Sequence, residues 1–230
     1  MRINKYISET GFCSRRTTDR LIKEKRITIN GDLCEAGDEV ESGDIVLIDG
    51  HPIRASKGAP VYLVLNKPIG ITCTAAKHIE GNIIDFIDYP ERIFPIGRLD
   101  KASEGLILLT NDGAIVNKIM HSEYNHEKEY IVTVDKPYTD SFIEGMARGV
   151  EILGVQTKPC IVTRISETVF RIILTQGLNR QIRRMSMVFG YKVIKLKRIR
   201  IMNIKLDDLP TGKWRELSKE ELTHLKELLQ

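Results

Sequence analysis

The feature that most constrains how this chain can fold is an interruption of its hydrophobic patterning near residue 55. The stretch DGHPIRASKGAP, at residues 49–60, is rich in glycine, proline and small residues and carries no apolar periodicity. Such composition is typical of a linker, and 230 residues are enough for one large domain or two smaller ones. We therefore expect a first domain over residues 1–54, a linker over residues 55–60 and a second domain over residues 61–230.

The charged residues are unevenly distributed along a chain whose net charge is only +4. Residues 1–26 hold eight Lys or Arg and three acids, whereas residues 27–50 hold seven acids and no base. Residues 171–205 hold ten bases and no acid, in a segment with the apolar periodicity of folded chain. Cations concentrated on particular segments indicate recognition of a phosphate backbone. Solvated surface charge is an equally good interpretation of the composition taken alone.

Several functional classes are disfavoured by the sequence. No apolar run approaches the ~18 residues of a membrane span, and the opening residues MRINKYISETG lack the pattern of an export signal. We therefore expect a cytoplasmic protein that does not enter a membrane. The cysteines form no CxxC pair and the histidines add no ligand spacing, which predicts reduced thiols and no metal site.

The first domain has the pattern of two short helices followed by a hairpin. Apolar residues at helical spacing follow Arg2, and a second helix is expected to begin near the capping candidate Ser14. Within ITING, at residues 27–31, the Asn-Gly pair is a strong hairpin signal, and an apolar strand follows within residues 39–48.

The residues that give this domain a recognisable pattern are Arg2, Lys5, Ser14, Arg15 and Arg16, with the turn Asn30-Gly31 after the second helix. The pattern resembles the S4-type RNA-binding domain, although Lys25 stands where that family usually has a glycine. A helix face carrying arginines can bind A-form RNA through its phosphates and shape. We expect the four cations among these residues to bind RNA; an ordinary helical hairpin with a solvated basic face is the alternative.

The second domain alternates strands with helices, and its strands follow one another through short connections. This pattern favours an α+β fold with a mixed, mainly antiparallel sheet over regular parallel winding. The predicted strands are VYLVLNKP, EGLILLT, EYIVTV, CIVTRI, VFRIILT and YKVIKL. The predicted helices are AIVNKIM, SFIEGMARG, NRQIRRMSMVF and KEELTHLKELL.

The most informative stretch is FPIGRLDKASEGLILLTNDG, at residues 94–113, where Arg98 and Asp100 stand between Gly97 and an apolar strand. A partly desolvated carboxylate needs a cationic partner, and in a cleft it can act as a nucleophile or a base. A loop salt bridge between Arg98 and Asp100 would be the favoured interpretation if this segment stood alone.

Four further motifs accompany this stretch in a consistent order: LNKP at 65–68, HEKEYIVTVDKP at 126–137, GLNRQIRRM at 177–185 and KRIRIMNIKLDDLPTGKWREL at 197–217. Together with GRLD at 97–100, Ser103 and Gly105, they resemble the pseudouridine synthases, in particular the branch that modifies ribosomal RNA. With the S4-like front, the resemblance covers essentially the whole chain. It implies an S4-like α/β domain followed by a pseudouridine synthase catalytic domain.

This resemblance implies roles for three residues. Asp100 would be the catalytic carboxylate, either adding to the sugar or base or removing the 2′ proton, a choice that stays open. Arg183 would pair with Asp100 in a bidentate manner and hold it charged. Tyr130 would stack on the extruded uracil and assist proton transfer at C5, although a strand tyrosine is more often a core residue. The isomerisation itself requires no cofactor and no metal.

The resemblance also implies the substrate and the residues that bind it. We expect a monomer acting on large-subunit (23S) ribosomal RNA near the peptidyl-transferase region, with a tRNA as a further candidate. The cations expected to contact RNA in the second domain are Lys67, Arg98, Arg180 and Arg184.

Two other functions are weighed against this one. A non-catalytic RNA-binding or ribosome-assembly protein would need only the basic segments and the S4-like unit. A nucleoside or glycoside hydrolase also uses a carboxylate at an anomeric carbon, but such enzymes usually present two, and the sequence offers no compelling second acid beside Asp100.

Overall fold

The structure of the protein is a computed structural model, which describes residues 1–53, 59–76, 78–120 and 124–230. The chain forms two compact units, one of Met1–Pro60 with Asn111–Gly113 and one of Val61–Thr110 with Ala114–Gln230. Most of the linker predicted at residues 55–60 lies outside the described residues. Among those described, no helix is both long and apolar enough to span a membrane.

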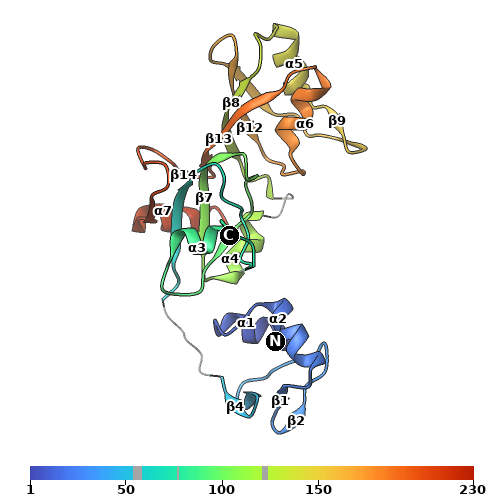
Figure 1. The fold of residues 1–230 in the computed structure, drawn as a ribbon, viewed down its shortest axis with the longest axis vertical. Coiled ribbons are helices and arrows are strands. Elements are labelled where there is room, and N and C mark those ends of the chain that lie inside the picture. Colours follow the sequence, from blue (N-terminus) through green and yellow to red (C-terminus); the bar gives the residue numbers. More distant parts are fainter. Residues whose placement is uncertain (54–58, 77, 121–123) are drawn as a thin grey trace. The chain divides into compact units, whose positions relative to one another are not determined.

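The N-terminal unit packs two helices against a small sheet (Figure 1). The helices are α1 (Ile3–Glu9) and α2 (Arg15–Lys23), and the antiparallel strands, in the order β2-β1-β3-β4, are β1 (Ile27–Ile29), β2 (Asp32–Leu33), β3 (Val46–Ile48) and β4 (His51–Pro52). The predicted pattern of two helices followed by a hairpin is therefore confirmed.

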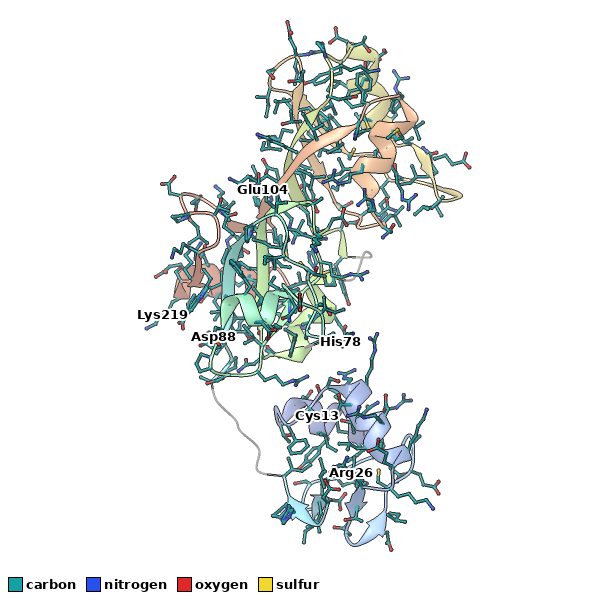
Figure 2. All side chains as sticks on the ribbon, in the orientation of Figure 1. Cys13, Arg26, His78, Asp88, Glu104 and Lys219 are labelled. Atoms are coloured by element: carbon teal, nitrogen blue, oxygen red, sulfur yellow. The ribbon has the colours of Figure 1, made fainter. Side chains whose placement is uncertain are left out.

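Local interactions explain why these elements begin and end where they do. The Ser14 hydroxyl accepts a hydrogen bond from the Thr17 amide and caps α2, which satisfies one of the free amides at a helix start. Asn30 and Gly31 both adopt positive φ, as the tight turn between β1 and β2 requires. Arg26, labelled in Figure 2, pairs with Asp49 at 2.6 Å and joins the start of β1 to the end of β3.

The second unit is built on a nine-stranded sheet among the described residues. Its main order is β11-β12-β8-β13-β7-β5-β15, with β14 paired to β13 and β6 paired to β7. The bounds are β5 (Tyr62–Lys67), β6 (Phe94–Ile96), β7 (Glu104–Thr110), β8 (Lys128–Val134), β11 (Ile161–Arg164), β12 (Val169–Leu174), β13 (Val193–Ile201), β14 (Ile204–Lys205) and β15 (Trp214–Glu216). Among the described strands of this sheet, β7 and β13 alone pair in parallel, so the predicted mixed, mainly antiparallel sheet is confirmed.

Five helices and a hairpin complete the described part of this unit. They are α3 (Ile83–Ile87), α4 (Gly113–Met120), α5 (Asp140–Arg148), α6 (Gln181–Val188) and α7 (Lys219–Glu227), with the hairpin β9 (Glu151–Ile152) and β10 (Val155–Gln156). Helices α5 and α6 pack over the end of the sheet that contains β8, β12 and β13 (Figure 1). The helices predicted from periodicity are all present, whereas α3 and β9–β10 are too short to show a period.

The strands β5 and β7 are buried on both faces, which explains their nearly continuous apolar sequence. Leu63, Leu65 and Ile107 face the larger core, which extends to α5 and α6, while Val64 and Leu106 face a second core under α4 and α7. All four cysteines are free thiols, buried or half-buried, as the sequence predicts.

Candidate active site

A pocket of about 500 Å³ opens in the second unit where α6 meets the loop between β6 and β7. Its walls come from that loop, from β8 and β13, and from the start of α6. Asp100 is the only carboxylate and Tyr130 the only aromatic residue among the described residues that line it, and six Lys or Arg line it as well. The described walls are therefore strongly positive around one negative group.

Asp100 lies on the loop that leads into β7, with its side chain 34% exposed. The Ser103 amide donates a hydrogen bond of 2.9 Å to the Asp100 carbonyl and closes a turn at this point. The turn carries the carboxylate into the pocket rather than into the sheet.

Arg183, on α6, connects this helix to β13 and to the loop before β7. Its Nη1 donates to the Val193 carbonyl at 2.9 Å, and its Nη2 donates to the Ala102 carbonyl at 3.2 Å and to the Ser103 hydroxyl at 3.1 Å. Its Nε lies 3.5 Å from Asp100 Oδ2 but makes no hydrogen bond to any residue that the structure describes. Burial lowers the pKa of Arg183, and the nearby Asp100 charge opposes that change.

The bidentate pairing predicted between Arg183 and Asp100 is therefore wrong. The two Nη atoms of the guanidinium are already occupied by the loop and by β13, which leaves a single ionic contact through Nε. Arg180 provides a second cationic contact to this carboxylate, because its Nη1 lies 3.4 Å from Asp100 Oδ2. Arg180 reaches this position from a left-handed backbone conformation at the start of α6.

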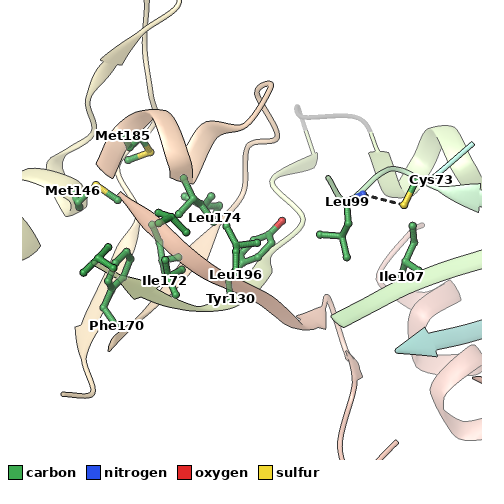
Figure 3. Close-up of a cluster of buried hydrophobic side chains, with 14 of the residues drawn as sticks. Cys73, Leu99, Ile107, Tyr130, Met146, Phe170, Ile172, Leu174, Met185 and Leu196 are labelled. Carbon is green, nitrogen blue, oxygen red and sulfur yellow. Dashed lines mark hydrogen bonds between the residues drawn. The ribbon is translucent and has the colours of Figure 1, made fainter. Parts of the chain in front are cut away.

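Tyr130 lies on β8 and forms part of the pocket wall, with only 9% of the residue exposed. Figure 3 shows its ring beside Leu196 and Leu174, with the hydroxyl directed to the side of the cluster where Leu99 lies. The same ring is a cross-strand neighbour of Arg198, whose guanidinium carbon lies 6.0 Å from the ring centre. Tyr130 is thus both a core residue and a wall of the pocket.

Comparison with known proteins gives the family. The family described as RNA pseudouridylate synthase matches residues 61–187, and the S4 domain matches residues 1–46. The chain belongs to the RNA pseudouridylate synthases. Enzymes of this family convert uridine to pseudouridine in RNA, and this synthase carries an S4 RNA-binding domain in front of its catalytic unit.

Individual relatives place the synthase among the RluF-type enzymes. It is 53% identical to "Dual-specificity RNA pseudouridine synthase RluF" of Salmonella typhi, over 100% of this chain and 80% of that protein. It is 35% identical to "Ribosomal large subunit pseudouridine synthase B" of Bacillus subtilis, over 99% and 96% of the two chains. A crystal structure of a pseudouridylate synthase superposes with a TM-score of 0.73 at 28% identity, covering 98% of this chain and 99% of that one.

One predicted RNA contact of the synthase is wrong. Lys67 has no exposed surface, and its Nζ donates to the carbonyls of Pro68 at 2.8 Å and Ile71 at 2.9 Å. Burial lowers the pKa of this ammonium. Because the last residue of β5 points into the core, Lys67 supports the loop that follows the strand and cannot reach a phosphate.

The other predicted RNA contacts of the synthase lie nearer the surface. Arg98 is exposed at the pocket rim, and Arg184 is exposed on α6, where it donates to the carbonyl and side chain of Asn179. In the N-terminal unit Arg2, Arg15 and Arg16 are exposed, whereas Lys5 is partly buried and lies 3.8 Å from Glu9.

Sequence reasoning assigned no individual role to two pocket residues of the synthase, Arg198 and Lys128. Arg198 is only 3% exposed and Lys128 only 7% exposed, yet both line the pocket. A signal was available for Arg198, since it stands two residues after the buried Leu196 on the same strand and alternation places both side chains on one face.

Proposed function

We propose that this synthase modifies uridines of large-subunit ribosomal RNA near the peptidyl-transferase region and accepts a tRNA as a second substrate, with Asp100 as its catalytic carboxylate. The names of its relatives support the substrate class, since one is called a ribosomal large-subunit enzyme and another a dual-specificity enzyme. The arrangement that carries the proposal is one carboxylate held between Arg180 and Arg183 in a pocket walled by Tyr130.

The reaction is an isomerisation, so a carboxylate can start it without a redox partner or a group donor. The bond between C1′ and N1 breaks, the uracil turns, and a bond between C1′ and C5 forms while the C5 proton leaves and N1 gains one. Asp100 promotes this either as a nucleophile or as the base that removes the 2′ proton. Both routes use its anionic form, and the adjacent guanidinium groups of Arg180 and Arg183 stabilise that charge.

The target uridine must leave its stack to reach Asp100, so the enzyme has to compensate the lost stacking. Tyr130 does this with its ring, as the only aromatic residue among the described pocket residues. Arg98, exposed at the rim, and Arg180, beside the carboxylate, suit the phosphates that flank an extruded nucleotide.

The N-terminal unit, which we propose comprises residues 1–54, supplies affinity. Helix α2 begins with Arg15 and Arg16 and has no acid in its first turn. Cations at a helix N-terminus oppose the helix dipole, which is unfavourable for the free protein but favourable once a phosphate binds there. Arg2 and Lys5 add two more cations to this unit.

The test of the catalytic assignment is Asp100→Asn in a pseudouridine formation assay on purified ribosomal RNA. The substitution keeps the size of the side chain but removes its charge, its nucleophilicity and its basicity, so product should fall below detection. RNA binding, measured by filter retention, and folding, measured by circular dichroism, should survive. Turnover by a well-folded Asp100→Asn protein would remove the catalytic assignment.

Arg183→Lys is the companion variant. A lysine retains a positive charge near Asp100 but cannot reach the Val193, Ala102 and Ser103 acceptors together. Its rate should be reduced by about 10- to 100-fold without reaching the inactivity of Asp100→Asn. A fully active Arg183→Lys enzyme would show that the three contacts to the loop and β13 do not position the carboxylate.

The substrate assignment has a separate test. Chemical mapping of pseudouridine across ribosomal RNA and tRNA, from cells with and without this protein, should show sites that depend on it. Loss of sites near the peptidyl-transferase region and in a tRNA supports the proposal, whereas loss of sites elsewhere overturns the proposed target.

A further inference from the structure

Two buried cations, Arg198 and Lys128, form part of the pocket wall next to Tyr130. They are 3% and 7% exposed and come from adjacent strands, β13 and β8. Arg198 is the cross-strand neighbour of Tyr130, and Lys128 stands two residues before Tyr130 on the same strand. Both positive charges therefore belong to the part of the pocket wall that Tyr130 also forms.

Neither cation has a carboxylate partner among the described residues. Arg198 Nε donates to the Leu106 carbonyl at 2.7 Å, but its buried Nη2 has no hydrogen-bond partner in the described part of the chain. Lys128 Nζ donates to the His126 carbonyl at 3.3 Å. Burial lowers the pKa of Lys128, and the Arg198 charge lowers it further.

A buried charge without a counter-ion is costly to the free protein. A purely structural role at position 198 would need only a donor for the Leu106 carbonyl, which does not require a guanidinium group with a second, unpaired nitrogen. A negative group that enters the pocket with the substrate would provide the counter-ion that these buried cations lack.

The reaction creates such a group on the base. When the C1′–N1 bond breaks, its electron pair stays on N1 and is delocalised over the uracil oxygens O2 and O4. If a carboxylate adds to C6 of the base instead, the electron pair of the C5–C6 double bond moves toward C4 and places negative charge on O4. Every route therefore places negative charge on the uracil oxygens, and donors fixed at that position stabilise the transition state.

We propose that Arg198, with Lys128 beside it, binds the uracil oxygens and stabilises the negative charge that develops on the detached base. The proposal rests on the proposed function, in which the uracil stacks against Tyr130. Asp100 then acts at the sugar side of the breaking bond, or at C6, while Arg198 acts at the base. The anion is transient, because its negative charge is neutralised when C5 bonds to the electrophilic C1′; the C5 proton then leaves and N1 gains one.

The test compares two RNA substrates, one with uridine and one with 5-fluorouridine at the target position, in single-turnover reactions. Fluorine withdraws electrons and stabilises the uracil anion, so breaking the glycosidic bond of 5-fluorouridine depends less on a protein cation. The measured quantity is the consumption of the unmodified nucleoside in nuclease digests. The decisive number is the ratio of the 5-fluorouridine rate to the uridine rate.

Arg198→Met removes the charge and keeps the length of the side chain. We expect uridine consumption to fall by about a hundredfold and the rate ratio to rise by about tenfold, with RNA affinity nearly unchanged. Arg198→Lys should restore part of the uridine rate. An unchanged ratio, with both rates lowered together, overturns the proposal in favour of a positioning role. A weakened affinity with a smaller salt slope and an unchanged ratio overturns it in favour of a phosphate contact.

Arg200→Met is the matched control. Arg200 lies on the same strand, is also mostly buried and donates to Glu129 at 2.6 Å, but it does not line the pocket. Its loss should leave the ratio unchanged even if stability falls. Lys128→Met provides a second measurement of the ratio if Arg198→Met does not fold. Asp100→Asn in the same assay separates the two proposals, since activity of that variant removes the catalytic assignment whatever the ratio shows.

Discussion

Tyr130 lies where the hydrophobic core meets the pocket. Its ring packs with Leu174 and Leu196 (Figure 3), and the same three residues line the pocket. Tyr130 can make both contacts because β8 runs from the pocket into the core, and alternate side chains of this strand share one face. Substitutions here change packing and chemistry together, so a variant that preserves the ring is needed to separate them.

Tyr130→Phe keeps the ring and removes only the hydroxyl, so we expect unchanged stability and RNA affinity with slower formation of product. Tyr130→Ala removes the ring, which should lower the free energy of unfolding by about 3 kcal/mol and weaken engagement of the extruded base. Urea unfolding and isomerisation kinetics measure the two effects. Parental turnover in both variants would leave Tyr130 a core residue only.

The pairing of β7 with β13 joins the two halves of the large sheet. The strands run in parallel here, through Lys197 opposite Glu104 and Arg198 opposite Gly105. Gly105 has φ of +106°, and a Cβ at this position would overlap the Arg198 backbone. Glycine is therefore required both by the backbone conformation and by the close approach of β13.

Gly105→Ala should cost about 3–4 kcal/mol of stability, since strain at positive φ adds to the overlap with β13. Because β13 carries Arg198, the activity of the folded fraction should fall as well. Gly70→Ala is the matched control, with φ of +93° and nothing within 4 Å of the added Cβ; it should cost about 1 kcal/mol. Thermal unfolding of both proteins measures the difference, and equal costs would show that β13 yields freely to the added methyl group.

At the scale of the whole molecule, each compact unit has a hydrophobic core of its own. The core of the N-terminal unit contains Ile3, Ile7, Leu21, Ile22, Ile27, Cys34, Val40, Val46 and Ile48. The two cores of the second unit draw their residues from position 62 onward. A unit with its own core can fold without the rest of the chain, so the two activities that we assign to the units should be separable.

Deleting residues 1–60 should leave a folded catalytic unit that binds RNA more weakly. If Arg2, Lys5, Arg15 and Arg16 all contact phosphate, the slope of log affinity against log salt should become shallower by about 3–4. Filter binding across a salt series measures the slope, and circular dichroism checks the fold. Unchanged affinity and slope in the truncated protein would contradict the assignment of RNA binding to this unit.

Local patterns in the sequence determined most of the elements. Periodicity located the longer helices and strands, and Ser14 and the Asn30-Gly31 turn marked element ends. These features depend on a residue and its near neighbours in the chain, which the sequence displays directly. Asp100 and Tyr130, which share one pocket, were indicated by the resemblance of their motifs to a known family.

Only the tertiary structure decided which residues are buried and which charges meet. A motif shows that Lys67 follows an apolar strand, but not that its ammonium turns into the core. Arg180 reaches Asp100 across 80 positions of sequence, and the parallel pairing of β7 with β13 sets Arg198 into the pocket. Alternation along a strand tells which side chains share a face, but the partner strand and its register depend on contacts between distant segments.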